Sequence, residues 1–305
     1  MVCDFVLRRS TCLNGIQMTV DGEKAAMNQL SINNHDRDAS AMRYVYPVVS
    51  RRAGGVSVGI NLNTNNACNW ACVYCQVPGL TRGGPLPVDL LVLERELGTL
   101  LDDILKGDFL VRRVPEGMRQ LSDVAFSGNG EPTTAEEFPQ AVDLVIAAVK
   151  RRGMAGQLPL RVITNGSMMH RPAVLSALSR MRECSGEVWF KIDRATEAGI
   201  RAVNQTAIKP SQMSSHLKAA ADVIPVWVQT CWFGVDHTPP SEEEEASYVQ
   251  FVAEHRQWIA GIHLYGIARP SMQPAGERLL RLPRDELARL AERLKKIGVI
   301  AQISE

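Results

Sequence analysis

The sequence predicts an α/β fold in which a parallel sheet is covered by helices. Short apolar segments alternate with longer segments that carry leucine or alanine at helical spacing, and about six such β–α units fit between residues 55 and 270. Strands that alternate with helices pair in parallel through right-handed crossovers. The 305 residues suffice for one large domain with extensions or two small domains. No segment rich in Pro, Gly or Ser divides the β–α region.

Element boundaries follow from apolar spacing and from the residues that begin helices. Pro172 and Pro283 suit a first helical turn, and Ser241 precedes a run of glutamates that favours a helix start. Residues 44–49 are extended in character. The expected strands are 56–62, 123–126, 160–164, 187–192, 224–230 and 259–265, with 299–303 as a candidate for one more, and the expected helices are 88–106, 136–152, 172–181, one from 241 and 283–296.

The charge balance predicts no general attraction to nucleic acid or to anionic membranes. The chain has 34 basic and 33 acidic residues, a net charge of +1 and a hydrophobic content of 45%. No apolar run approaches the ~20 residues of a membrane span, and Arg8 and Arg9 follow the first apolar residues, unlike the layout of a signal peptide. Seven cysteines, three of them clustered, argue against a disulfide framework. We therefore expect a cytoplasmic protein with no membrane partner.

The N-terminal part differs from the rest of the chain in its sequence pattern. Residues 1–40 show no sustained periodicity and contain several turn-forming Asn and Asp residues. Cys3 and Cys12 lie there, and we expect small buried or unligated thiols. The predicted organisation is an N-terminal extension over 1–44, a core barrel over 45–275, and a C-terminal helix and tail over 276–305.

Three cysteines lie within eight residues, just past the expected strand 56–62. Cys68, Cys72 and Cys75 carry the type of ligand that holds iron–sulfur clusters, and three thiolates on a four-iron cluster leave one iron open to a small molecule. The alternative is a structural zinc site, which needs four closed ligands. The remaining candidates, Cys184 and Cys231, are remote in sequence. The motif therefore favours a [4Fe-4S] cluster.

The spacing Cys-x3-Cys-x2-Cys resembles that of the radical S-adenosylmethionine (SAM) superfamily. The resemblance implies a partial (β/α)6 TIM-like barrel with an N-terminal extension and a C-terminal helix. It also implies an oxidoreductase with two cofactors, a [4Fe-4S] cluster and SAM, in which SAM chelates the open iron and is cleaved to a 5′-deoxyadenosyl radical. An electron donor such as flavodoxin or ferredoxin would be a partner.

The resemblance also assigns residues to SAM. Tyr74, the aromatic before the last cysteine, matches the residue placed beside the adenine, and Tyr265 would lie beside the adenine too. The turn after the second strand matches a glycine–glutamate motif that holds the SAM ammonium through backbone carbonyls and the carboxylate. Its members here are Gly128, Asn129, Gly130 and Glu131. Packing under the loop and an ordinary tight turn are the alternatives for these positions.

Polar residues that end the third and fourth strands form a further set. Related enzymes use such side chains for the ribose and the carboxylate of SAM. Thr164 and Asn165 end one strand, Lys191 could pair with the carboxylate, and Asp193 could accept a hydrogen bond from a ribose hydroxyl. The alternative for each is an ordinary strand-end polar residue.

A finer resemblance covers about residues 45–295. Segments 46–52, 57–61, 73–76, 126–133 and 268–270 resemble the bacterial and archaeal Fe–S oxidoreductase group related to the wyosine synthase of tRNA. That enzyme carries a second cluster on three upstream cysteines, whereas only Cys3 and Cys12 are available here. The neutral charge also gives no basic tRNA surface, so tRNA as substrate is not supported. The leading expectation is hydrogen abstraction from a small-molecule or nucleotide substrate. An activating enzyme for a glycyl-radical protein, a tRNA-modifying enzyme and a metal-stapled binding module are the alternatives.

Two further candidates are open at this point. Arg51 and Arg52 could clamp a carboxylate or phosphate, or form a solvated turn. Cys231, at the end of the fifth strand, could be the acceptor thiol of a methyl-transferring enzyme, or a buried apolar thiol.

Overall fold

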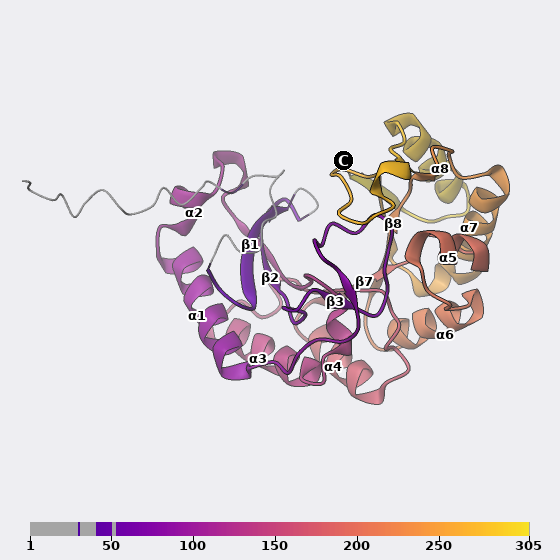
Figure 1. Cartoon of the computed structure of the whole chain (residues 1–305). Coiled ribbons are helices and arrows are strands. Elements are labelled where there is room, and N and C mark those ends of the chain that lie inside the picture. Colours follow the sequence, from indigo (N-terminus) through magenta and orange to yellow (C-terminus); the bar gives the residue numbers. More distant parts are fainter. Residues whose placement is uncertain (1–29, 31–40, 51–52, 305) are drawn as a thin grey trace, which may run out of the picture.

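The computed structural model describes residue 30, residues 41–50 and residues 53–304. Within this part, the main sheet has eight strands in the order β1-β2-β5-β6-β7-β8-β10-β12. The sheet curls into a half-barrel, with helices along its outside, which confirms the fold expected from the sequence (Figure 1). The strands are β1 (Val45–Ser50), β2 (Gly55–Ile60), β5 (Leu121–Phe126), β6 (Leu160–Thr164), β7 (Gly186–Lys191), β8 (Val226–Cys231), β10 (Gly261–Tyr265) and β12 (Ala301–Ser304).

One strand departs from the parallel pattern. β1 pairs with β2 in antiparallel register, from Val45 opposite Ile60 to Ser50 opposite Gly55, whereas every later neighbour in the main sheet is parallel. Only residues 51–54 connect the two strands, and a connection that short joins antiparallel strands because a parallel pair needs a crossover of a dozen or more residues. The candidate strand at 299–303 is confirmed as β12, which pairs with β10.

The helices pack apolar faces against the outer surface of the sheet. The expected helices are confirmed as α1, α3, α4, α7 and α8, and Ser241 caps α7 by accepting from the backbone N–H of Glu244. The pair α5 and α6 between β7 and β8 was not expected, because α5 ends after eight residues at left-handed Gln205 and α6 restarts at Pro210. The helices are α1 (Leu90–Lys106), α2 (Phe109–Arg113), α3 (Phe138–Arg151), α4 (Pro172–Arg182), α5 (Glu197–Asn204), α6 (Pro210–Ala221), α7 (Glu242–His255) and α8 (Arg284–Lys296).

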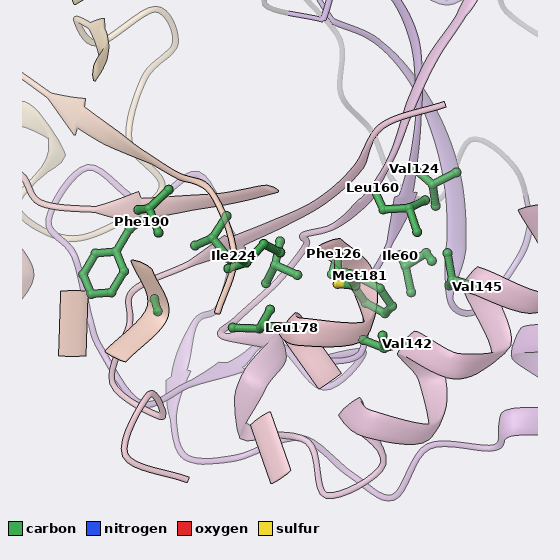
Figure 2. Packing of buried hydrophobic residues seen from close by; sticks show 14 of the residues in the cluster. Ile60, Val124, Phe126, Val142, Val145, Leu160, Leu178, Met181, Phe190 and Ile224 are labelled. Atoms are coloured by element: carbon green, nitrogen blue, oxygen red, sulfur yellow. The ribbon is translucent and has the colours of Figure 1, made fainter. Parts of the chain in front are cut away.

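The main core fills the space between the sheet and these helices (Figure 2). Phe126 of β5 packs edge-on against Phe138 of α3, with ring centroids 5.4 Å apart. Phe126 thus points outward, toward the helices. Because side chains alternate along a strand, the residues on either side of it point into the half-barrel. On β5 the outward residues are Val124 and Phe126 and the inward residues are Asp123 and Ala125. The sheet is therefore apolar outside and mixed inside.

The parallel strands place their carboxyl ends on one rim of the half-barrel, where ligands of such folds bind. The loop with the three cysteines follows β2 at this rim and includes two short strands, β3 (Ala67–Cys68) and β4 (Thr81–Arg82), which pair with each other. Among the described helices, none combines the length and apolar character needed to cross a bilayer.

Candidate active site

The three cysteines of the motif line one end of a cavity of about 370 Å³ inside the half-barrel. Cys68, Cys72 and Cys75 are half-buried free thiols. Cys231 at the end of β8 also lines the cavity and is 1% exposed, whereas Cys184 lies in the main core behind the sheet. Among the described residues, no three or more His, Cys, Asp or Glu side chains lie in an arrangement that could hold a metal ion.

Helix α5 fixes the middle of the cysteine loop. The backbone N–H of Val73 donates to the carbonyl of Val203 at 2.9 Å, and Val73 is buried in a small apolar cluster with Phe233. The side chain of Asn204 donates from Nδ2 to the sulfur of Cys72, with the two atoms 3.4 Å apart. A donor aimed at this sulfur stabilises it when it is negatively charged.

A carboxylate at the end of β7 connects the loop to the sheet. The Tyr74 hydroxyl donates to Asp193 Oδ2 at 2.5 Å, and Asn204 Nδ2 donates to the same oxygen at 2.7 Å. The second oxygen of Asp193 accepts from the backbone N–H of Cys231 at 2.8 Å. Burial and the Asp193 charge raise the pKa of the Tyr74 phenol well above its usual value. Asp193 lies behind the cavity wall, where it holds residues that line the wall.

The segment after β10 holds the far side of the cysteine loop. Ser271 Oγ donates to the carbonyl of Val73 at 2.7 Å, and the backbone N–H of Met272 donates to the carbonyl of Cys75 at 2.9 Å. The amide of Gln273 donates to the carbonyl of Val77 at 2.8 Å. Sequence reasoning missed Ser271, Gln273 and Asn204, because polar residues in loops and at helix ends carry no periodic signal.

The glycines of the turn after β5 permit close packing against the start of the cysteine loop. Gly128 has φ +143, and a Cβ on it would overlap Asn61. A Cβ on Gly130 would overlap the carbonyl of Ala67 and the amide of Asn63. Here the close approach that glycine allows is therefore to the loop backbone. Asn129, between the glycines, lines the cavity and has its Oδ1 buried with no hydrogen-bond partner in the described structure.

Glu131 joins this turn to the end of β6. Its Oε1 accepts from the Thr164 hydroxyl at 2.7 Å and from the backbone N–H of Thr133 at 3.1 Å, and its Oε2 accepts from the backbone N–H of Asn165 at 2.6 Å. Burial raises the pKa of Glu131, although these donors oppose the shift. Glu131 and Asn165 line the cavity, whereas Thr164 is fully buried behind the wall. Asn165 Nδ2 donates to Asn69 Oδ1 at 2.9 Å and so ties β6 to the cysteine loop.

Lys191 carries a positive charge into the cavity wall. Its Nζ donates to the Tyr265 hydroxyl at 3.1 Å and lies 4.9 Å from the centroid of the Tyr74 ring. Burial favours the neutral amine, but the acidic groups around it, Tyr265 and Asp193 first among them, outweigh burial and raise the pKa of Lys191. The cation and two aromatic rings thus lie together in the wall of the cavity that the cysteines also line.

The donor chemistry of the cysteines fits an iron–sulfur cluster. Burial raises the pKa of Cys68 to about 11 and that of Cys72 to about 12, so both are neutral thiols in the protein without metal. Thiolates are the species that bind metal, and binding releases the thiol protons. With a cluster bound, the Asn204 amide and the Lys191 ammonium would lie beside the negatively charged sulfur of Cys72.

Comparison with known proteins supports the fold and gives a distant sequence relative. No family model matches the chain. A protein named GTPase Obg from Brachyspira hyodysenteriae is 24% identical over 164 residues, a match that covers 52% of this chain and 21% of that protein. The chain therefore spans about a fifth of the length of this relative.

Two solved structures resemble most of the chain. A radical SAM methyltransferase from Sphaerobacter thermophilus has a TM-score of 0.56 at 13% identity, covering 85% of this chain and 68% of that one. Streptococcus suis SuiB bound to S-adenosylmethionine has a TM-score of 0.52 at 10% identity, covering 84% of this chain and 49% of that one. The chain thus spans about half the length of SuiB. The half-barrel described here is a fold that the chain shares with these two proteins.

Proposed function

We propose that this protein is a radical SAM enzyme that holds a [4Fe-4S] cluster on Cys68, Cys72 and Cys75. The observation that carries the proposal is the placement of three free thiols, spaced Cys-x3-Cys-x2-Cys, at one end of a cavity on the carboxyl-end rim of the half-barrel. When bound, the cluster and SAM would together supply a 5′-deoxyadenosyl radical that abstracts hydrogen from a substrate.

The residues around the loop would hold the cluster ligands in a fixed geometry. Asn204 would donate to the Cys72 sulfur, and Asp193 would fix both Asn204 and Tyr74. Ser271 and Gln273 would restrain the loop from the opposite side. Ligands that are held before the metal arrives lose less conformational entropy when the cluster binds.

Other residues of the cavity would bind SAM. The ammonium of Lys191 suits the SAM carboxylate, and the orphan Oδ1 of Asn129 suits the SAM ammonium, together with the carbonyls of Gly128 and Gly130. Glu131 Oε2 accepts from the backbone N–H of Asn165 and keeps capacity for a second donor. Tyr74 and Tyr265 would border the adenine. Thr164 and Asp193 are proposed to act by holding Glu131 and Tyr74.

The substrate class follows from the resemblance to the wyosine synthase-related group and from the neutral charge. We infer a small molecule or a nucleotide as the substrate and a flavodoxin or ferredoxin as the reductant of the cluster. A tRNA substrate is possible, but the neutral charge gives it no support. Arg51 and Arg52, the candidate anion clamp, lie outside the described residues, as do Cys3 and Cys12.

Anaerobic reconstitution with iron and sulfide tests the proposal. We expect about four irons per chain, an EPR signal of the reduced protein that changes when SAM is added, and release of 5′-deoxyadenosine with dithionite. A Cys68→Ala, Cys72→Ala, Cys75→Ala triple variant should lose all three signals. Cys184→Ala is the matched control, because this thiol lies outside the cavity. Binding of zinc alone, or no SAM cleavage by the iron-loaded protein, would contradict the proposal.

A further inference from the structure

The cavity continues from the cysteines into the middle of the half-barrel, where a second set of polar side chains lines it. Along β7 and β8, Lys191 and Cys231 line the end near the cysteines, and the residues two positions earlier, Trp189 and Gln229, line the deeper end. Residues two apart share one face of a strand. Ser57, Asp123 and Arg161 complete this deep end from β2, β5 and β6.

The charged groups of the deep end are already paired with one another. Arg161 donates from Nε to Glu187 at 2.7 Å and from Nη1 to Asp123, and Ser57 also donates to Asp123. One guanidinium thus contacts two carboxylates. Burial raises the pKa of Asp123, but with Asp123 ionised or neutral these three groups carry no net positive charge. An anionic substrate group would gain little here, because it would approach two carboxylates along with the guanidinium.

Aromatic rings hold Arg161 on its other side. Its guanidinium lies 4.9 Å from the centroid of the Trp189 ring, and Trp189 packs against His263, with ring centroids 4.5 Å apart. His263 in turn stacks on Trp227 at 4.7 Å. The planar groups of four strands therefore contact one another in a row across the interior. This packing makes the deep end rigid and leaves Arg161 little freedom to turn toward a new partner.

Gln229 is the exception in this paired and packed interior. It is 2% exposed, it lines the cavity, and its side-chain amide has no hydrogen-bond partner in the described part of the chain. The backbone carbonyl of Gln229, by contrast, accepts a hydrogen bond from the N–H of Ile192 at 3.2 Å. The side chain borders the cavity, so its amide is available to a molecule bound there. A carboxamide offers one acceptor oxygen and two N–H donors, which together match another amide.

We propose that Gln229 is the recognition residue for a small uncharged substrate that carries a carboxamide or lactam group. The amide of such a substrate would accept from the Gln229 N–H and donate to the Gln229 oxygen, a pairing that uses both the donor and the acceptor of the side chain. The inference rests on the proposed function, because SAM would occupy the end of the cavity near the cysteines and leave the deep end to the substrate. Gln229 would then set which molecule meets the radical.

Binding of simple probes to the reconstituted, oxidised, SAM-loaded protein tests the inference. We expect 2-pyrrolidinone, a neutral lactam, to bind measurably by saturation-transfer NMR, and cyclopentanone, acetate and inorganic phosphate to bind at least tenfold more weakly. Gln229→Leu should weaken 2-pyrrolidinone about tenfold or more, which corresponds to the loss of a buried hydrogen bond. Gln250→Leu, an exposed glutamine on α7, is the control and should bind like wild type.

The two proposals fail in different ways. Absence of SAM cleavage in the wild-type protein overturns the proposed function, whatever the probes do. Cleavage of SAM with equal lactam binding by wild type and Gln229→Leu, with preference for acetate or phosphate, or with no lactam binding at all overturns the role of Gln229. Iron content identical to wild type confirms that the Gln229→Leu protein is folded, and Gln229→Glu, which keeps the shape and removes the donor, gives a second variant with the same expected loss.

Discussion

The amide of Asn204 lies 3.4 Å from the sulfur of Cys72 and joins the end of α5 to the centre of the cysteine loop. The same nitrogen donates to Asp193, so the amide is held by a buried carboxylate while it points at a proposed cluster ligand. Hydrogen bonds to cysteine sulfurs are one of the ways in which proteins set the reduction potential of iron–sulfur clusters.

Replacement of Asn204 by leucine should therefore lower the reduction potential of the cluster. Without the donor, the extra negative charge of the reduced cluster is less stabilised, so reduction becomes harder. An EPR-monitored redox titration of the reconstituted protein measures the shift, with Asn65→Leu, which has no contact with a cysteine sulfur, as control. A potential equal to that of wild type would show that the contact does not tune the cluster.

Removal of the Tyr74 hydroxyl should destabilise the protein. In Tyr74→Phe, Asp193 keeps Asn204 and the backbone N–H of Cys231 but loses a hydrogen bond of 2.5 Å. A hydrogen bond to a charged group contributes about 1.5–3 kcal/mol. We expect a fall of this size in the free energy of unfolding, measured by urea denaturation of the protein without metal. A change below about 0.5 kcal/mol would mean that solvent replaces the hydroxyl without loss.

Replacement of Gln273 by alanine should accelerate loss of iron with little effect on global stability. Gln273 restrains the carbonyls of Cys75 and Val77 from outside the sheet, so its removal loosens the loop but leaves the main core intact. The rate of iron transfer to a chelator should rise several-fold while the melting temperature shifts little. Gln302→Ala, at an exposed position on β12, is the matched control. Equal iron-release rates for the two variants would contradict a restraining role.

A methyl group on Gly130 should displace the cysteine loop. The added Cβ would overlap the carbonyl of Ala67 and the side chain of Asn63, so either the turn after β5 or the loop must shift. Overpacking of this kind costs about 1–3 kcal/mol, and we expect Gly130→Ala to lower iron content on reconstitution. Gly84→Ala is the control, because a Cβ on Gly84 meets nothing within 4 Å. Full iron loading of Gly130→Ala would show that the turn adapts.

The parts of the site that sequence reasoning found are those with local or strand-end signals. The three cysteines lie within eight residues, and Glu131, Asn165, Lys191 and Tyr265 each follow or end a recognisable strand. Parallel strands bring such ends to one rim whatever the details of packing. The sequence did not reveal what each side chain contacts there, such as the bonds from Thr164 and Asn165 to Glu131.

The residues of the site that sequence reasoning missed are placed by long-range packing. Asn204 meets Cys72 across 132 positions, and Ser271 meets Val73 across 198. Gln229 belongs to a segment that was correctly predicted as a strand, but the alternation of Val and polar residues does not say that the inward face borders a cavity. Burial on both sides of the sheet is decided by the curl of the whole half-barrel, which no single segment encodes.

The bonds from residues 271–273 to the cysteine loop also constrain the order of events during biosynthesis. The ribosome releases the cysteines about 200 residues before the segment that completes their surroundings. Until then the carbonyls of Val73, Cys75 and Val77 lack the donors that this segment supplies. The proposed metal centre would consequently be a product of the finished chain, and delivery of iron to a nascent polypeptide would meet ligands that are not yet held in place.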